Sequence, residues 1–149
     1  MGSIPPVGDG RLWWSMAAMS RRVPFDQFTD PRHLTGVQGE LAALTWLAAR
    51  GWTIEAHRYR FGRHDLDLVI RRGSLVAFVE VKTRRGSRHG APGEAIGWRK
   101  RRALALGARW WRREHGRPGD QYRFDLVSVD LAPGGPRLDH LEDAWRESV

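Results

Sequence analysis

Hydrophobic and polar positions along the chain repeat with the period of a helix in two stretches. Over residues 35–50 apolar residues recur every three or four positions, which predicts an amphipathic helix that Gly51 ends. At its start, Thr35 and Gln38 stand at the spacing of an N-terminal capping box. A second helix is predicted over residues 92–115, with Pro92 in its first turn.

Elsewhere the apolar positions are typical of strands. Strands are predicted over residues 53–59, 65–70, 75–82 and 122–131, with a short edge strand at 138–141. This order predicts an α/β fold with a mixed central sheet flanked by helices. We expect residues 1–33 to form a loosely ordered extension and residues 34–149 to form a single domain.

One acidic residue lies where an apolar one is expected. In the first helix Glu40 falls on the same stripe as Leu44 and Leu47, together with Val37 and Leu41. A buried carboxylate costs several kcal/mol unless it is paired, protonated or bound to a metal. The alternative is a side chain that bends out to water or toward the helix N-terminus. The pattern leaves both interpretations open.

Further carboxylates are predicted to gather on the central hairpin. If residues 71–74 form a four-residue turn, Asp65 lies opposite Glu80 and Asp67 lies opposite Phe78. Alternation then places Asp65, Asp67, Glu80 and Lys82 on one face of the sheet. The opposite face is predicted to be wholly apolar and consists of Leu66, Leu68, Ile70, Leu75, Ala77, Val79 and Val81.

Such a group of like charges needs a cation. Mg²⁺, or Mn²⁺ in its place, prefers carboxylate oxygens, water and phosphate oxygens, so Asp65, Asp67 and Glu80 are candidate metal ligands. Lys82 would then stabilise charge on a phosphate or orient an attacking water. In the alternative interpretation, Lys82 only neutralises nearby carboxylates on a solvated face.

Composition narrows the class of partner. The 149 residues carry 25 Lys and Arg against 17 Asp and Glu, a net charge of +8 with a pI near 11.2. This favours a polyanion, most simply nucleic acid. The absence of cysteine excludes disulfides and thiolate chemistry and fits a reducing cytoplasm. No apolar run approaches the roughly 20 residues of a membrane span.

The positive charge is concentrated in residues 84–118, which hold eleven basic and two acidic residues. Lys100 falls on the apolar stripe of the second helix, where it either reaches toward the carboxylates or lays its stem along apolar surface with its ammonium in water. Trp110 and Trp111 are predicted to be core. A solvated charged face is the alternative to a phosphate-binding surface for DNA. The candidate phosphate contacts are Arg84, Arg85, Arg99, Lys100, Arg101, Arg102 and Arg109.

Several motifs match a known pattern. Asp67 followed by Glu80-Val81-Lys82 is similar to the D…(D/E)-x-K core of the PD-(D/E)XK nucleases. Gly36 to Glu40 (G-x-x-G-E), the FVEVKTR stretch at 78–84, Lys100 and RFDLV at 123–127 together resemble the YraN-like family of bacterial proteins. The likeness extends over residues 34–145.

The resemblance implies an αβββαβ restriction-endonuclease-like fold and Mg²⁺-dependent cleavage of phosphodiester bonds. The first hypothesis is therefore a Mg²⁺-dependent endonuclease that cleaves DNA and selects its structure, since no base-reading motif is visible. By position, Asp67 and Glu80 would ligate the metal, Lys82 would assist the attacking water, and Glu40 would be an auxiliary carboxylate. His64-Asp65 stands where this family usually has Gly-Glu, which favours the alternative of a nucleic-acid-binding module without catalysis. A third hypothesis is a basic protein that binds an acidic protein or a membrane surface.

Overall fold

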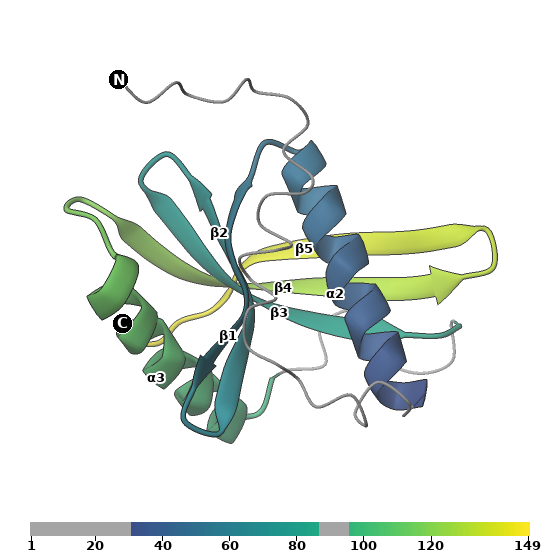
Figure 1. Cartoon of the computed structure of the whole chain (residues 1–149), viewed down its shortest axis with the longest axis horizontal. Helices are drawn as coiled ribbons and strands as arrows, with labels where there is room; N and C mark the ends of the chain where they lie inside the picture. The colour runs from purple at the N-terminus through teal and green to yellow at the C-terminus, as the bar shows by residue number, and fades with distance from the viewer. Residues whose placement is uncertain (1–30, 87–95) are drawn as a thin grey trace, which may run out of the picture.

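The computed structural model describes residues 31–86 and 96–149. Two helices and five strands follow one another along this part of the chain (Figure 1). The elements are α2 (Pro31–Ala49), β1 (Thr53–Phe61), β2 (His64–Arg72), β3 (Leu75–Arg84), α3 (Trp98–His115), β4 (Gln121–Ala132) and β5 (Gly135–Trp145).

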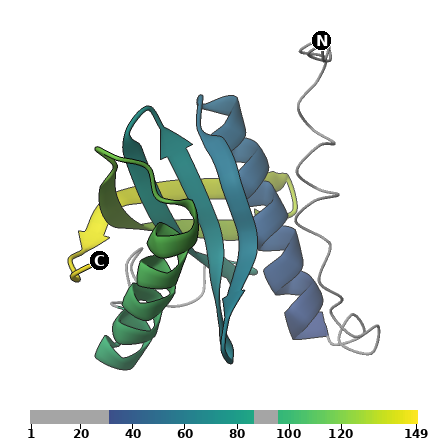
Figure 2. The same ribbon diagram turned by 60° about the vertical axis from the view of Figure 1, so that its left-hand side comes forward.

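The strands form one sheet in the order β1-β2-β3-β4-β5. β3 and β4 are parallel, with α3 in the connection between them, and the other neighbours are antiparallel. α2 and α3 cover opposite faces of this sheet (Figure 2). The predicted α/β class and αβββαβ core are therefore confirmed, and β5 extends the sheet by one antiparallel strand. Among the described residues no helix is both long and apolar enough to span a membrane.

Each helix closes its own hydrophobic core. On the α2 side, Leu44 and Leu47 pack with Leu68, Val79 and Val127. On the α3 side, an aromatic group forms most of the core, with Phe78, Trp111, Phe124 and Trp145 among its buried members. The sheet is buried on both faces, which explains the long apolar runs of β2, β3 and β4.

α2 begins before the predicted start at residue 35, so the expected boundary between residues 33 and 34 falls inside it. The hydroxyl of Thr35 donates to the carbonyl of Pro31 at 2.8 Å, one turn back, and therefore does not cap the helix. The end was predicted correctly. Gly51 has φ +86°, and the amides of Gly51 and Trp52 close a Schellman motif onto Ala48 and Leu47. The rest of the predicted extension lies outside the described residues.

The predicted β2–β3 register is wrong by two residues. Arg72 pairs with Leu75, so the turn contains Gly73 and Ser74 alone, and Gly73 has the positive φ of +59° that such turns require. Because side chains alternate with a period of two, this shift keeps the predicted faces. Leu66 is the exception. It packs on the α3 side, whereas Leu68 packs on the α2 side.

The predicted apolar stripes of the helices are partly wrong. α3 starts at Trp98, and residues 92–95 of its predicted first turn lie outside the described residues. Trp111 is buried as predicted, but Trp110 is 45% exposed, and Ala105 and Ala108 pack inward instead. In α2, Leu41 faces solvent while Ala43 is buried. The predicted short edge strand at 138–141 is the middle of β5, which has 11 residues.

Candidate functional site

The site lies where β2 and β3 separate. The paired register of these strands stops at Leu68 and Val79. Beyond this point the carboxylate of Asp67 accepts a hydrogen bond from the backbone amide of Val81 at 2.8 Å, in place of a backbone carbonyl. The next residues that would pair are Asp67 and Glu80. The corrected register thus brings Glu80 to Asp67, where the prediction had placed Phe78.

Asp67 lies in a strongly acidic environment. Burial raises the pKa of its carboxyl well above the ordinary value, and the neighbouring carboxylates of Glu80 and Glu40 raise it further. The hydrogen bond from Val81 and the charge of Lys100 lower it only in part. The ionised form of Asp67 is therefore unfavourable here, and a cation between these groups would stabilise it.

Glu80 is 5% exposed and meets two lysines. Its Oε1 lies 3.4 Å from Nζ of Lys100 and 4.0 Å from Nζ of Lys82. Both lysine side chains stay about half exposed, and Lys100 reaches the site from α3, as its position on the apolar stripe suggested. Oε2 of Glu80 is buried and has no hydrogen-bond partner among the described residues. A buried carboxylate oxygen without a hydrogen-bond donor lowers the stability of the fold unless a ligand binds to it.

Glu40 is buried, and its pairing answers the question that the sequence left open. Nε2 of His57 donates to Oε2 at 2.8 Å, and Nε of Arg58 donates to the same oxygen at 2.7 Å. Nη2 of Arg58 reaches Oε1 at 3.3 Å. Burial raises the pKa of Glu40, but these hydrogen bonds outweigh burial, so its pKa is lowered. Glu40 is held as an ion pair beside the site, and its predicted auxiliary role stays a prediction.

His57 and Arg58 were missed by the sequence analysis. In a regular strand, neighbouring side chains point to opposite faces, so both could not meet one carboxylate. Arg58 has φ +54°, in the left-handed region that residues other than glycine rarely adopt, and this turns both side chains toward α2. A single sequence carries no signal that an arginine will adopt a positive φ. This strained backbone conformation places the side chains of both His57 and Arg58 at Glu40.

The donor set fits a hard divalent cation of the kind that keeps water and substrate ligands. Asp67 and Glu80 lie together with a buried oxygen left over, and Mg²⁺ is commonly held by one or two carboxylates plus waters and phosphate oxygens. Asp65 is partly exposed and is not among the groups that raise the pKa of Asp67. Within residues 31–86 and 96–149, no three acidic or histidine side chains form a complete metal cage.

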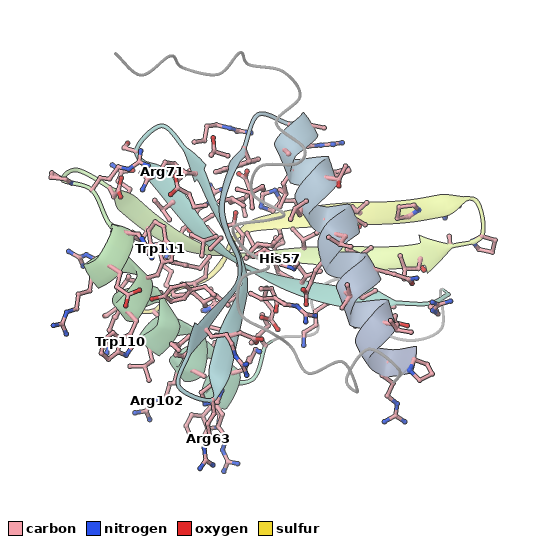
Figure 3. The ribbon with its side chains drawn as sticks, in the orientation of Figure 1. His57, Arg63, Arg71, Arg102, Trp110 and Trp111 are labelled. Carbon is pink, nitrogen blue, oxygen red and sulfur yellow. The ribbon has the colours of Figure 1, made fainter. Side chains whose placement is uncertain are left out.

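The candidate phosphate contacts divide into two groups. Some are engaged: Nε of Arg101 donates to the carbonyl of Ile96, Nε of Arg109 donates to that of Ser148, and Arg85 bonds Gln38 of α2. Others point into solvent from the first turns of α3, namely Arg99 and Arg102. Arg102 lies near the β1–β2 turn in Figure 3. Arg84 ends β3 and is partly buried.

Comparison with known proteins places the chain among its relatives. The model of the uncharacterised protein family UPF0102 matches residues 39–129. The chain belongs to this family. A UPF0102 protein of Anaeromyxobacter dehalogenans is 38% identical over 116 residues, which are 78% of this chain and 87% of its own length. A UPF0102 protein of Nocardia farcinica is 43% identical over 108 residues, which are 72% of this chain and 85% of its own length. A UPF0102 protein of Symbiobacterium thermophilum is 43% identical over 100 residues, 67% of this chain and 85% of its own length.

The match to UPF0102 confirms the predicted YraN-like resemblance. The matched stretch runs from α2 to β4 and so contains Glu40, Asp67, Glu80, Lys82 and Lys100. The family description assigns no reaction. What the site does must therefore be argued from its chemistry.

Proposed function

We propose that this protein is a Mg²⁺-dependent endonuclease that cleaves phosphodiester bonds of DNA. The observation that supports the proposal best is the state of Asp67 and Glu80. They are crowded together, one carries a raised pKa, and the other has a buried oxygen without a donor among the described residues. Two lysines flank them with half-exposed ammonium groups. Acidic ligands beside exposed cations suit a substrate that is itself an anion.

The side chains divide the chemistry between them. Asp67 and Glu80 would hold the cation, which when bound supplies charge stabilisation at the phosphate and lowers the pKa of a water. Lys82 would donate hydrogen bonds that orient the attacking water, since its ammonium reaches Glu80 while staying open to solvent. Lys100 would lie against the phosphate oxygens on which negative charge develops. Glu40 would hold His57 and Arg58 in place beside these groups.

The approach of DNA is supported by the charge around the site. Arg99 and Arg102 lie on the exposed face of α3, close in sequence to Lys100. Arginine side chains of this kind bind the phosphate backbone without reading bases, and the affinity then falls steeply with salt. Sequence-independent binding matches the lack of a base-reading motif. Mn²⁺ would be expected to replace Mg²⁺, since both take oxygen ligands.

The test is cleavage of labelled linear, nicked and branched DNA in Mg²⁺ or Mn²⁺. Asp67→Asn, Glu80→Gln and Lys82→Ala should each lower the cleavage rate by about a hundredfold or more, the usual effect of removing one group that stabilises the transition state. Glu147→Gln is the matched control, because this exposed residue follows the end of β5 and forms no ion pair with a described residue, and it should cleave like the wild type. Absence of cleavage of every substrate, or equal cleavage by Lys82→Ala, would refute the proposal.

One observation favours a second candidate, a nucleic-acid-binding module without catalysis. Both oxygens of Glu40 are engaged by basic side chains, and Asp65 does not complete the acidic group. Such a module would bind DNA in a salt-dependent manner with equal affinity in EDTA and in Mg²⁺, and would leave every substrate intact. Measuring binding and cleavage on the same samples separates the two candidates.

A further inference from the structure

A groove of about 430 Å³ lies between the β1–β2 turn and the outer side of α3. The hairpin contributes Arg60, Phe61 and Arg63, and the helix contributes Leu106 and Trp110. In Figure 3 Arg63 lies at the tip of the hairpin, and Trp110 lies away from the sheet while its neighbour Trp111 points inward. The groove is separate from Asp67 and Glu80, and none of its lining residues was predicted to bind a ligand.

The floor of the groove is formed by the Phe61 ring. Phe61 is buried and packs against α3 at Gly107, where a Cβ atom would lie 2.2 Å from the ring. No residue with a side chain fits at this position without displacing the hairpin. Because glycine allows the hairpin to touch the helix, the groove exists before any ligand arrives.

The walls combine exposed apolar surface with exposed positive charge. Trp110 and Leu106 are 45% and 47% exposed, unusual for such large side chains on one helix face. The guanidinium of Arg113 lies 5.6 Å from the centre of the Trp110 ring. Arg60 and Arg63 are exposed and form no ion pair with a described residue. The one acidic group, Glu114, already accepts a hydrogen bond from Tyr59 at 2.6 Å.

A flat aromatic ring beside exposed arginines suits one class of ligand. Proteins that bind single strands stack bases on aromatic side chains and hold the phosphates with basic ones, whereas paired bases are not free to stack in this way. The groove is also close to the candidate site. His64 at its edge precedes Asp67 by three residues, roughly 10 Å along a strand at about 3.3 Å per residue. One oligonucleotide could therefore contact both.

We propose that this groove binds an unpaired nucleotide, with its base stacked on Trp110 and its phosphates held by Arg60 and Arg63. The inference rests on the proposed function for its choice of nucleic acid as ligand. It extends that function, because a groove of this kind would direct the protein to single strands, flaps or frayed ends. A blunt duplex would use only the arginines of α3.

The experiment compares two labelled 16-nucleotide strands by fluorescence anisotropy in EDTA, one of thymidines and one entirely abasic. Both carry the same phosphate charge, so their difference measures base stacking. The wild type should bind the thymidine strand about 5- to 150-fold more tightly, the range that one stacked base gives. Trp110→Ala should remove this preference, and Leu41→Ala, which removes an exposed side chain of α2, should keep it.

The roles of Arg60 and Arg63 are tested by the salt dependence of binding. Arg60→Ala and Arg63→Ala should weaken binding of both strands equally, and each should reduce the slope of log affinity against log salt by about 0.7. Arg137→Ala, an exposed arginine of β5, is the control and should leave the slope unchanged. Two results would overturn the inference: equal binding of the two strands by the wild type, or an undiminished preference for the thymidine strand in Trp110→Ala.

The two proposals fail separately. Since the binding assay contains no divalent cation, Asp67→Asn should keep the preference for bases whatever the protein does to DNA in Mg²⁺. Base-dependent binding without cleavage would retain the groove and refute the nuclease. Cleavage without base-dependent binding would support the nuclease and refute the groove as a nucleotide-binding site.

Discussion

The ion-pair network at the other end of the sheet offers a quantitative test of how this protein handles buried charge. Asp120, just before β4, accepts hydrogen bonds from Nη1 and Nη2 of Arg71 at 2.5 and 2.9 Å. It also accepts one from the amide of Arg117 at 2.8 Å. Nε of Arg71 donates to Glu55 at 2.8 Å. Arg71 and Asp120 are almost fully shielded from solvent, and Figure 3 shows Arg71 well away from His57.

The expected cost of Asp120→Asn follows from the electrostatics. The hydrogen bonds from Arg71 lower the pKa of Asp120 from 3.8 to about 2, although burial opposes them. At roughly 1.4 kcal/mol per pKa unit this corresponds to about 2 kcal/mol of stability at pH 7. Breaking a buried pair from one side costs about 3–5 kcal/mol, and Glu55 still neutralises Arg71, so we expect a loss of about 2–4 kcal/mol.

The contribution of Asp120 to stability should depend on pH in a definite direction. Because the pKa of Asp120 is lowered by folding, its contribution is complete above the ordinary value and is lost as the pH falls from about 4 toward 2. Urea unfolding followed by tryptophan fluorescence at pH 7 and pH 2.5 measures both limits. The gap between wild type and Asp120→Asn should shrink at pH 2.5, while Asp139→Asn should differ little from wild type at either pH. A gap below about 0.5 kcal/mol at pH 7, or one that does not change with pH, would refute the reasoning.

Three further predictions concern the site and its supports. Asp67→Asn should raise the midpoint of thermal unfolding in EDTA, more at pH 8 than at pH 4, because burial and nearby carboxylates raise the pKa of Asp67 and its ionised form opposes folding. Mg²⁺ should raise the midpoint of the wild type but not that of this variant. A midpoint at pH 8 lower than that of the wild type would contradict the prediction. Gly107→Ala should cost about 1–3 kcal/mol in urea unfolding through overpacking, whereas Gly36→Ala, with no atom within 4 Å, should not destabilise. Trp111→Ala should lower the free energy of unfolding by about 3–5 kcal/mol, because Trp111 is buried, and Trp110→Ala by less than about 1 kcal/mol, because Trp110 is exposed. Equal losses in the two variants would contradict the prediction.

The carboxylate pair could be predicted from the sequence because strand alternation does not depend on the exact turn. The four-residue turn assumed at first gave Asp67 the wrong partner, yet a shift of two residues left the apolar side chains other than Leu66 on their predicted face. The correct register had a signal in the sequence, because Gly73-Ser74 is a dipeptide that favours a two-residue hairpin turn, and Gly73 adopts the positive φ that such a turn requires.

What could not be predicted depends on contacts between elements. Trp110 and Trp111 are adjacent and equally apolar, and helical periodicity placed both on one stripe. The side that packs is decided by Gly107, where the β1–β2 hairpin touches α3 and leaves Trp110 outside. In the same way Arg58 meets Glu40 only because of its positive φ. Both features lie at the candidate binding surfaces, where local rules are most often broken.

The strongest argument for a functional site is the contrast among the buried carboxylates of this protein. Asp120 is bound by two nitrogens of Arg71, and Asp125, which is 0% exposed, accepts from His140 at 2.7 Å and from the amide of Asp143 at 2.9 Å. Both are satisfied by the chain itself and need no ligand. Glu80 alone of these keeps a buried oxygen without a donor among the described residues, beside the raised pKa of Asp67. This contrast with Asp120 and Asp125 supports the proposal that Asp67 and Glu80 together hold a cation.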